Sequence, residues 1–267
     1  MRRTALTALC LAAVATVGLT GCGGEDKPDS STSRDSTARN TAKEHESTPK
    51  PEKEPFAGLT GGEIADKAFK ATTGASSLRM TGDVPDDGSG GTIHVDMALN
   101  KRGECAGTMG MDGQGEAELI KTGDTVYMRY DEKFLRSQSE GEPEESVDAA
   151  VALLAGKWTR MSAEGSDVKD LAGFCDLDQV LGGAEDGDSD ATRGKTTTID
   201  GTPAITLKAQ DGDDRFTLYV ATEGEPYMLR FDSTSTAEPG SLSFSDYDEP
   251  VPVEKPAGDV LDLDSLS

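Results

Sequence analysis

The chain has 267 residues, of which 50 are acidic and 26 basic, so its formal net charge is −24 at pH 7. This sign argues against a nucleic-acid-binding protein and against electrostatic docking on an anionic lipid surface, because both need clustered Lys and Arg side chains. Hydrophobic residues make up 34% and aromatic residues 5% of the chain. This low content of hydrophobic and aromatic residues indicates that part of the chain has too little apolar surface to pack.

Residues 1–21 are typical of an export signal, with a basic Met1-Arg2-Arg3 followed by an uncharged apolar run over 5–19. The run is too short to span a bilayer. The end of the segment, Leu19-Thr20-Gly21-Cys22, resembles the lipobox of bacterial lipoproteins, in which the cysteine thiol receives diacylglycerol and becomes the mature N-terminus. We therefore expect lipidation of Cys22 and attachment to the extracytoplasmic face of the cell membrane. The alternative is an ordinary secretory signal with a chance cysteine, and the choice between general and twin-arginine export stays open.

Residues 22–55 are predicted to be a lipidated cysteine followed by a disordered tether. From Gly23 to Pro55 there is no Val, Ile, Leu, Met or aromatic residue. A segment that buries nothing cannot offset its conformational entropy, and a coil of this length reaches about 30 Å. The eight acidic residues before residue 56 are matched by eight basic ones. The acidic excess therefore belongs entirely to the predicted folded domain, residues 56–267.

The domain is predicted to open with a helix that ends near Gly74. Thr60 and Glu63 have the spacing of a capping box, and Leu59 and Ile64 have that of a hydrophobic staple. Apolar residues then recur at helical spacing up to Gly74.

Beyond this helix the apolar period changes from 3.6 to 2, as in Ile93, Val95, Met97 and Leu99, which predicts antiparallel strands with one buried face. We expect nine strands, separated by Gly, Asp and Pro turns and centred on residues 93–99, 107–111, 118–121, 125–130, 196–199, 204–209, 215–221, 227–232 and 241–244.

The middle of the domain interrupts the strand pattern. Residues 131–146 are a polar insert, 147–154 are predicted to be a helix, and shorter helices are expected near 168–171 and 177–181. The order helix, strands, helices, strands predicts an α+β fold with one large antiparallel sheet.

Two cysteines remain in the predicted mature domain, Cys105 at a strand end and Cys175 in the helical region. An exported protein meets an oxidising compartment, which favours a disulfide that ties the helices to the sheet. The alternative is two buried free cysteines, because sequence spacing carries no distance. A catalytic thiol is disfavoured, since the domain has one histidine, His94, to act as its base.

Signatures of catalysis and of metal or cofactor binding are absent from the sequence. There is no Gly-x-Ser-x-Gly, His-Glu-x-x-His or Cys-x-x-Cys motif. His94 alternates with the apolar Ile93 and Val95, which places it on the outer face of its strand. We therefore expect neither an enzyme nor a cofactor or metal site, and we expect a monomer.

Segments spread over 58–255 together resemble the LppX/LprA/LprF/LprG lipoproteins. They include Gly107-Thr108-Met109-Gly110, Glu118-Leu119-Ile120-Lys121, Gly123-Asp124-Thr125-Val126-Tyr127, Gly156-Lys157-Trp158, Ile199-Asp200-Gly201-Thr202-Pro203-Ala204, Leu218-Tyr219-Val220, Pro226-Tyr227 and Phe244-Ser245-Asp246-Tyr247-Asp248-Glu249-Pro250-Val251. The resemblance implies a LolA-like half-barrel, in which a large curved antiparallel sheet wraps over helices around an inner hydrophobic cavity. It also implies a lipid or glycolipid ligand.

The apolar strand faces are rich in methionine, a flexible side chain that suits ligands of varied shape and that also fills gaps in ordinary cores. We expect the cavity lining to be Met80, Ile93, Val95, Met97, Leu99, Met109, Met111, Val126, Met128, Phe216, Leu218, Tyr227, Leu229 and Phe231. The predicted function is a membrane-anchored lipoprotein that binds an amphiphile and carries or presents it. The alternative is an envelope interaction or regulatory module with a closed core, and a hydrolase ranks third.

Overall fold

The computed structural model describes residues 54–85, 91–165, 168, 172–181, 190–235 and 239–265. The predicted export signal, Cys22, nearly all of the predicted tether and most of the helix expected near 168–171 lie outside these residues. Within them, no helix combines the length and the apolar character needed to cross a membrane.

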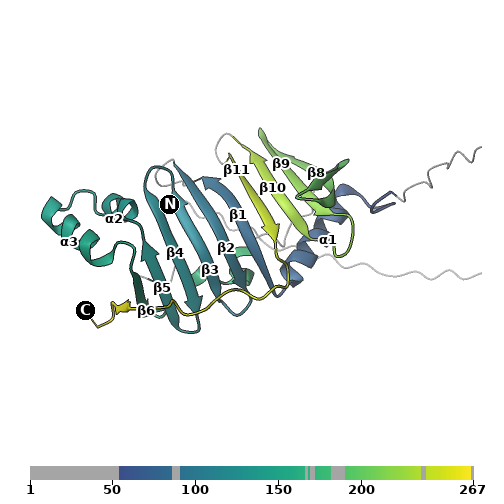
Figure 1. The fold of residues 1–267 in the computed structure, drawn as a ribbon. Coiled ribbons are helices and arrows are strands. Elements are labelled where there is room, and N and C mark those ends of the chain that lie inside the picture. Colours follow the sequence, from purple (N-terminus) through teal and green to yellow (C-terminus); the bar gives the residue numbers. More distant parts are fainter. Residues whose placement is uncertain are drawn as a thin grey trace, which may run out of the picture. The chain divides into compact units, whose positions relative to one another are not determined.

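A single sheet of twelve strands forms the body of the fold, in the spatial order β12-β6-β5-β4-β3-β2-β1-β11-β10-β9-β8-β7 (Figure 1). Neighbouring strands pair antiparallel, except that β12 pairs parallel to β6. The strands are β1 (Ser77–Pro85), β2 (Thr92–Asn100), β3 (Cys105–Met111), β4 (Gly115–Thr122), β5 (Thr125–Tyr130), β6 (Trp158–Ser162), β7 (Thr192–Ile199), β8 (Thr202–Asp211), β9 (Asp214–Ala221), β10 (Met228–Thr234), β11 (Pro239–Ser245) and β12 (Val260–Asp262). The predicted α+β fold with a large, open antiparallel sheet is confirmed.

All nine predicted strands are present. The described residues contain three further strands, β1, β6 and β12, which the period-2 pattern did not predict. In β1 the alternation of Leu78, Met80 and Val84 is interrupted by Gly82. A Cβ on Gly82 would lie 1.9 Å from the Ser241 carbonyl oxygen of β11, so glycine is what lets these two strands approach. Six strands lie between β11 and β12 in the sheet, so the chain crosses them after β11 before β12 pairs with β6 (Figure 1).

Helix α1 (Gly61–Gly74) begins with the predicted capping box, in which the Thr60 side chain accepts from the Glu63 N–H and the Glu63 carboxylate accepts from the Thr60 N–H. Its buried face includes Ile64, Ala65 and Ala68, and it packs on β7 to β10. The Thr72 hydroxyl, fully buried, accepts a hydrogen bond of 3.0 Å from the Met228 N–H. The helix therefore closes one half of the inner face of the sheet.

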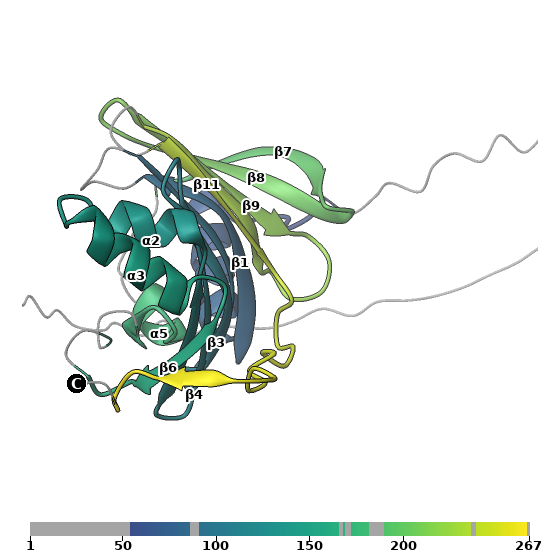
Figure 2. The ribbon, with the colours of Figure 1, turned by 60° about the vertical axis from the view of Figure 1, so that its left-hand side comes forward.

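In the middle of the chain, the described residues form the helices α2 (Glu132–Gln138), α3 (Glu144–Leu154) and α5 (Leu177–Leu181) (Figure 2). Neither α2 nor α3 has a buried residue, whereas Leu177 and Leu181 of α5 are buried. Helix α2 lies in the predicted polar insert, where Asp131 caps it by accepting from the Phe134 N–H at 2.6 Å. The predicted helices at 147–154 and 177–181 are confirmed as α3 and α5.

The two edges of the sheet are irregular. At one edge β7 changes register against β8 between Arg193 and Thr196, and Lys195 is exposed within this irregularity. At the other edge β12 has only three residues.

Candidate functional site

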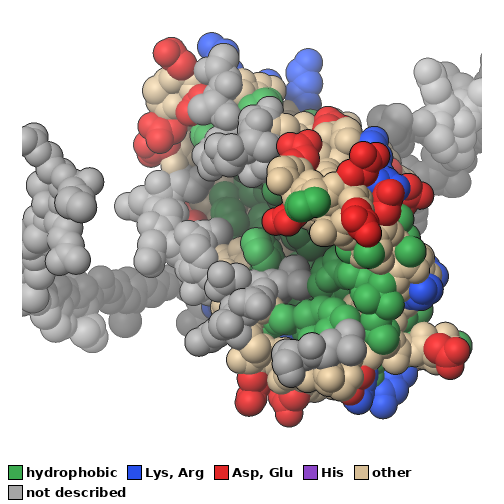
Figure 3. All heavy atoms as spheres, turned by 90° about the vertical axis from the view of Figure 1, so that its left-hand side faces the viewer, with side chains coloured by type: hydrophobic (Ala, Val, Ile, Leu, Met, Phe, Trp, Pro, Cys, Tyr) green, Lys and Arg blue, Asp and Glu red, His purple; other side chains and the backbone are tan. Residues whose placement is uncertain are grey.

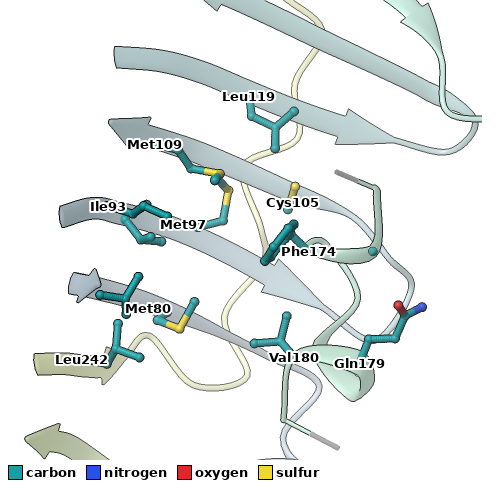
Figure 4. A pocket seen from close by; sticks show the side chains of 13 residues that line it. Met80, Ile93, Met97, Cys105, Met109, Leu119, Phe174, Gln179, Val180 and Leu242 are labelled. Carbon is teal, nitrogen blue, oxygen red and sulfur yellow. The ribbon is translucent and has the colours of Figure 1, made fainter. Parts of the chain in front are cut away.

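A cavity of about 540 Å³ lies between the inner face of the sheet and the helical segment around α5. Figure 3 shows hydrophobic side chains gathered in a hollow of this face, and Figure 4 shows the side chains that line it. The lining is almost entirely apolar and consists of Met80, Val84, Ile93, Val95, Met97, Cys105, Met109, Leu119, Gly173, Phe174, Gln179, Val180 and Leu242. A cavity of this size lies within the range of small-molecule sites.

The sheet wall of the cavity follows from strand register. Met80 of β1 stands opposite Met97 of β2, and Val95 of β2 stands opposite Met109 of β3. Directly paired residues project from the same face of a sheet, and alternate residues of one strand do so too. Three neighbouring strands therefore present a continuous apolar surface, in which three of these four side chains are methionines.

The opposite wall is held in place by covalent and polar contacts. Cys175 forms a disulfide with Cys105 of β3, so the predicted pairing is confirmed. Next to it, Asp176 pairs with Asn100 at the end of β2. The Asp176 carboxylate also accepts from the Asp178 N–H at 3.0 Å, at the start of α5. These contacts hold Phe174 over the sheet, as Figure 4 shows.

Phe174 is 60% exposed although it lines the cavity. A large aromatic side chain that only fills a core is rarely this exposed. Val180 and Gln179 of α5 line the same side, so one short segment next to the disulfide provides this wall.

A second cavity, of about 350 Å³, adjoins the first, because Val84 and Leu242 line both. It also contacts Phe216 and Phe231, whose rings stack with centroids 5.8 Å apart. Its remaining lining residues include Ser233 and Ser241, so it is more polar than the first cavity.

The structure brings together seven of the fourteen side chains that were expected to line a cavity. They are Met80, Ile93, Val95, Met97 and Met109 in the first cavity, and Phe216 and Phe231 in the second.

The other seven line neither cavity. Leu99, Val126 and Leu218 are buried in the packed core together with Ile64 of α1 and Leu177 of α5, so the inner face is filled at these positions. Met111, Met128 and Leu229 are partly buried. Tyr227 stacks on Tyr247 with ring centroids 3.9 Å apart and donates to Asp248 at 2.7 Å, and this hydrogen bond, more than its burial, raises the pKa of Tyr227 to about 12.

Sequence reasoning missed several lining residues. Leu119, Val84 and Leu242 lie on strands, and the period-2 pattern could have found them. Phe174, Gln179 and Val180 come from the helical segment, where no sequence pattern indicates which side chains face the sheet; the nearby Cys175 was the available signal.

His94 lies on the exposed side of β2, as its alternation with apolar residues predicts. Its Nδ1 lies 2.5 Å from an Asp83 oxygen and its Nε2 lies 2.8 Å from an Asp112 oxygen. The hydrogen bonds to Asp112 and Asp83 raise the pKa of His94 above its usual value. Among the described residues no cluster of three or more His, Cys, Asp or Glu side chains is arranged to hold a metal ion.

No protein-family model matches the chain, and no curated protein matches it. Among solved structures, LprF from Mycobacterium bovis matches with a TM-score of 0.51 at 15% identity, over 74% of this chain and 97% of LprF. The Mycobacterium tuberculosis lipoprotein LppX matches with a TM-score of 0.46 at 14% identity, over 73% of this chain and 98% of LppX. The resemblance predicted from the sequence segments is thus confirmed at the level of the fold.

Proposed function

We propose that this protein binds a lipid or another amphiphile non-covalently and carries it or presents it to a partner. The observation that supports this proposal is the apolar cavity of about 540 Å³ between the sheet and the segment 172–181. A fold that served only as an interaction module would gain stability by closing this space, because empty apolar volume costs van der Waals contacts.

The binding energy would come from burial of hydrocarbon. Each methylene group removed from water contributes about 0.8 kcal/mol, so a single acyl chain is enough for useful affinity without any specific polar contact. The three methionines of the sheet wall, Met80, Met97 and Met109, adapt their rotamers to chains of different shape. No bond needs to be made or broken in this function.

The proposal includes the attachment expected from the sequence. Cys22 would carry the diacylglycerol, residues 22–55 would form the tether, and residues 56–267 would form the ligand-binding domain on the extracytoplasmic face of the cell membrane.

Native mass spectrometry tests ligand binding. The domain should be purified from its own host without Cys22 and measured before and after solvent extraction. We expect an extra mass that extraction removes. A single apo mass in both samples, combined with no uptake of a fluorescent fatty-acyl probe, would favour the closed interaction module instead.

The anchor is tested separately with Cys22→Ala in the full-length chain. We expect the variant to be released as a soluble protein outside the cell or to accumulate as an uncleaved precursor. The lipobox interpretation would be wrong if the variant still fractionated with membranes in its mature form.

A further inference from the structure

A polar pocket of about 640 Å³ adjoins the apolar cavity, because Gly173 and Gln179 line both. Three cationic residues line this polar pocket: Lys101 and Arg102 from the β2–β3 turn, and Lys121 from the end of β4. The formal charge of the whole chain is −24, whereas in the lining of this pocket three carboxylates balance the three cations, so the pocket is less acidic than the chain as a whole.

Lys121 has an unusual position. It pairs with Cys105 of β3 and with Val126 of β5, and in β4 it follows Leu119 by two residues, so it belongs to the inner face of the sheet. Leu119 and Cys105 both line the apolar cavity. Lys121 therefore places an ammonium group where the apolar surface ends.

Lys121 donates to the Gly103 carbonyl oxygen at 2.5 Å. Among the ion pairs of the described residues none involves Lys121, whereas Arg102 lies 2.6 Å from Glu104 and Lys101 lies 3.7 Å from Asp178. An ammonium group has three donors, so Lys121 keeps donors for a further acceptor.

Three carboxylates, Asp124, Glu164 and Asp176, also line the polar pocket. Asp176 is already engaged, since its oxygens accept from the Asp178 N–H and from the Gln179 side chain at 3.0 and 3.2 Å. Asp124 and Glu164 are exposed, where water screens their charge. These carboxylates, together with Glu104, which interacts electrostatically with Lys121, weaken the positive potential at Lys121 without accepting hydrogen bonds from it.

The three spaces follow one another along the strands. The polar pocket lies at the β2–β3 and β4–β5 turns, the apolar cavity covers the middle of β1 and β2, and the second cavity reaches Pro85 at the far end of β1. A strand of nine residues spans about 30 Å. This order, a polar end followed by an extended apolar space, matches the order of groups in an amphiphile.

We infer that the ligand is an anionic amphiphile whose phosphate or carboxylate headgroup binds in the polar pocket at Lys121, with its hydrocarbon in the apolar cavity. The inference rests on the proposed function and names the ligand class for that same site. A headgroup oxygen would accept from the Lys121 ammonium, while Lys101 and Arg102 stay paired with Asp178 and Glu104.

Two fluorescent probes with identical acyl chains test the inference: phosphatidic acid, which carries a phosphate, and diacylglycerol, which carries none. They should be titrated into the wild-type domain, Lys121→Gln, Lys121→Arg and the matched control Lys208→Gln, which alters an exposed lysine on β8. We expect Lys121→Gln to weaken phosphatidic acid binding about 10- to 150-fold, as expected for a lost charge-assisted hydrogen bond, and to change diacylglycerol binding less than about twofold. Lys121→Arg should retain most of the phosphatidic acid affinity, and Lys208→Gln should resemble wild type.

Other results would overturn the inference. Equal weakening of both probes by Lys121→Gln would mean that Lys121 serves only the fold, through the Gly103 carbonyl. Equal weakening by Lys121→Gln and Lys208→Gln would indicate a general charge effect. Binding of diacylglycerol as tightly as phosphatidic acid by wild type would overturn the headgroup assignment while leaving the proposed function intact, whereas a failure of both probes to bind would count against both.

Discussion

The two halves of the sheet carry the same alternation of apolar and polar residues but are covered differently. Over β8 and β9, Leu207 and Val220 are at most 1% exposed, because α1 packs on this half. Over β1 to β3, Met80, Val95 and Met109 stay partly exposed and line a cavity. What covers this second half is the segment beside the disulfide, including the five-residue helix α5.

The comparison shows that strand pattern alone does not decide between core and cavity. Both halves offer an apolar face, and the length of the covering element decides how much of it is filled. The cavity wall includes the three methionines Met80, Met97 and Met109 beside branched side chains, whereas Leu207 and Val220 of the packed half are branched. Branched side chains have few rotamers and suit a fixed partner, while methionine adapts to a variable one.

Removing the disulfide should have the largest effect, because it attaches the cover of the cavity half. The bond closes a separation of 70 residues. On the chain-entropy model the double variant Cys105→Ala/Cys175→Ala should lose about 4 kcal/mol in its free energy of unfolding. Urea unfolding measures this loss. If alkylation detected free thiols in the denatured, unreduced wild-type domain, the disulfide would not be formed in the protein.

Truncating a side chain to alanine should have the next largest effect on stability, and this effect should differ between the two halves of the sheet. Ile64 is fully buried under α1, so Ile64→Ala should cost about 2 to 5 kcal/mol. Met109→Ala, in the cavity wall, should cost about 1 kcal/mol, because its side chain already borders open volume and less apolar area is lost. Denaturant unfolding of both variants checks the difference, and equal losses would mean that the cavity half is packed as tightly as the α1 half.

Enlarging a side chain should show the same difference between the two halves at a smaller scale. Leu207→Trp in the packed half should cost about 1 to 3 kcal/mol through overpacking. Met109→Trp should change stability by less than about 1 kcal/mol, since it grows into the cavity, and should lower the uptake of a fluorescent acyl probe. Melting temperatures and probe titrations check both variants; a Met109→Trp domain with unchanged uptake would contradict the assignment of the cavity as the ligand site.

The smallest effect on stability is expected on the outer face of the half of the sheet that carries the cavity, where His94 contacts Asp83 and Asp112. Because the folded pKa of His94 is raised, its protonated form stabilises the fold below the unfolded value near 6.5, and this contribution is lost as the pH rises through the folded pKa. An NMR titration should place the His94 midpoint above 6.5, with the signal assigned by its loss in His94→Gln. A midpoint at or below 6.5 would mean that the two carboxylates do not hold the charged form.

Much of the fold could be predicted because its elements carry local signals. The Thr60–Glu63 capping box and the alternation through β2 are short-range patterns that the structure reproduces. Strand β6 was missed because its fully buried position is the polar Thr159, and β12 was missed because three residues are too few to display a period. The parallel pairing of β12 with β6 joins residues about one hundred positions apart. Such pairing leaves no trace in local sequence.

The site was less predictable than the fold. Period 2 identifies which strand residues share a face, and so it found Val95 and Met109. It does not identify which part of that face a helix covers, and therefore Leu99 and Val126, on the same inner face, lie in the core instead. The position of Phe174 depends on the Cys105–Cys175 bond and the Asn100–Asp176 bridge, which are tertiary contacts.

The irregular edges of the sheet bear on how copies of this protein behave when crowded together. A long, regular edge strand offers a row of free backbone N–H and C=O groups to which another sheet can add. Here the register change in β7, with Lys195 exposed beside it, breaks that row at one edge, and the three-residue β12 leaves little of it at the other. Molecules concentrated at a surface would therefore not form a continuous intermolecular sheet when their edges meet. The inner cavity of each molecule would stay accessible to a ligand.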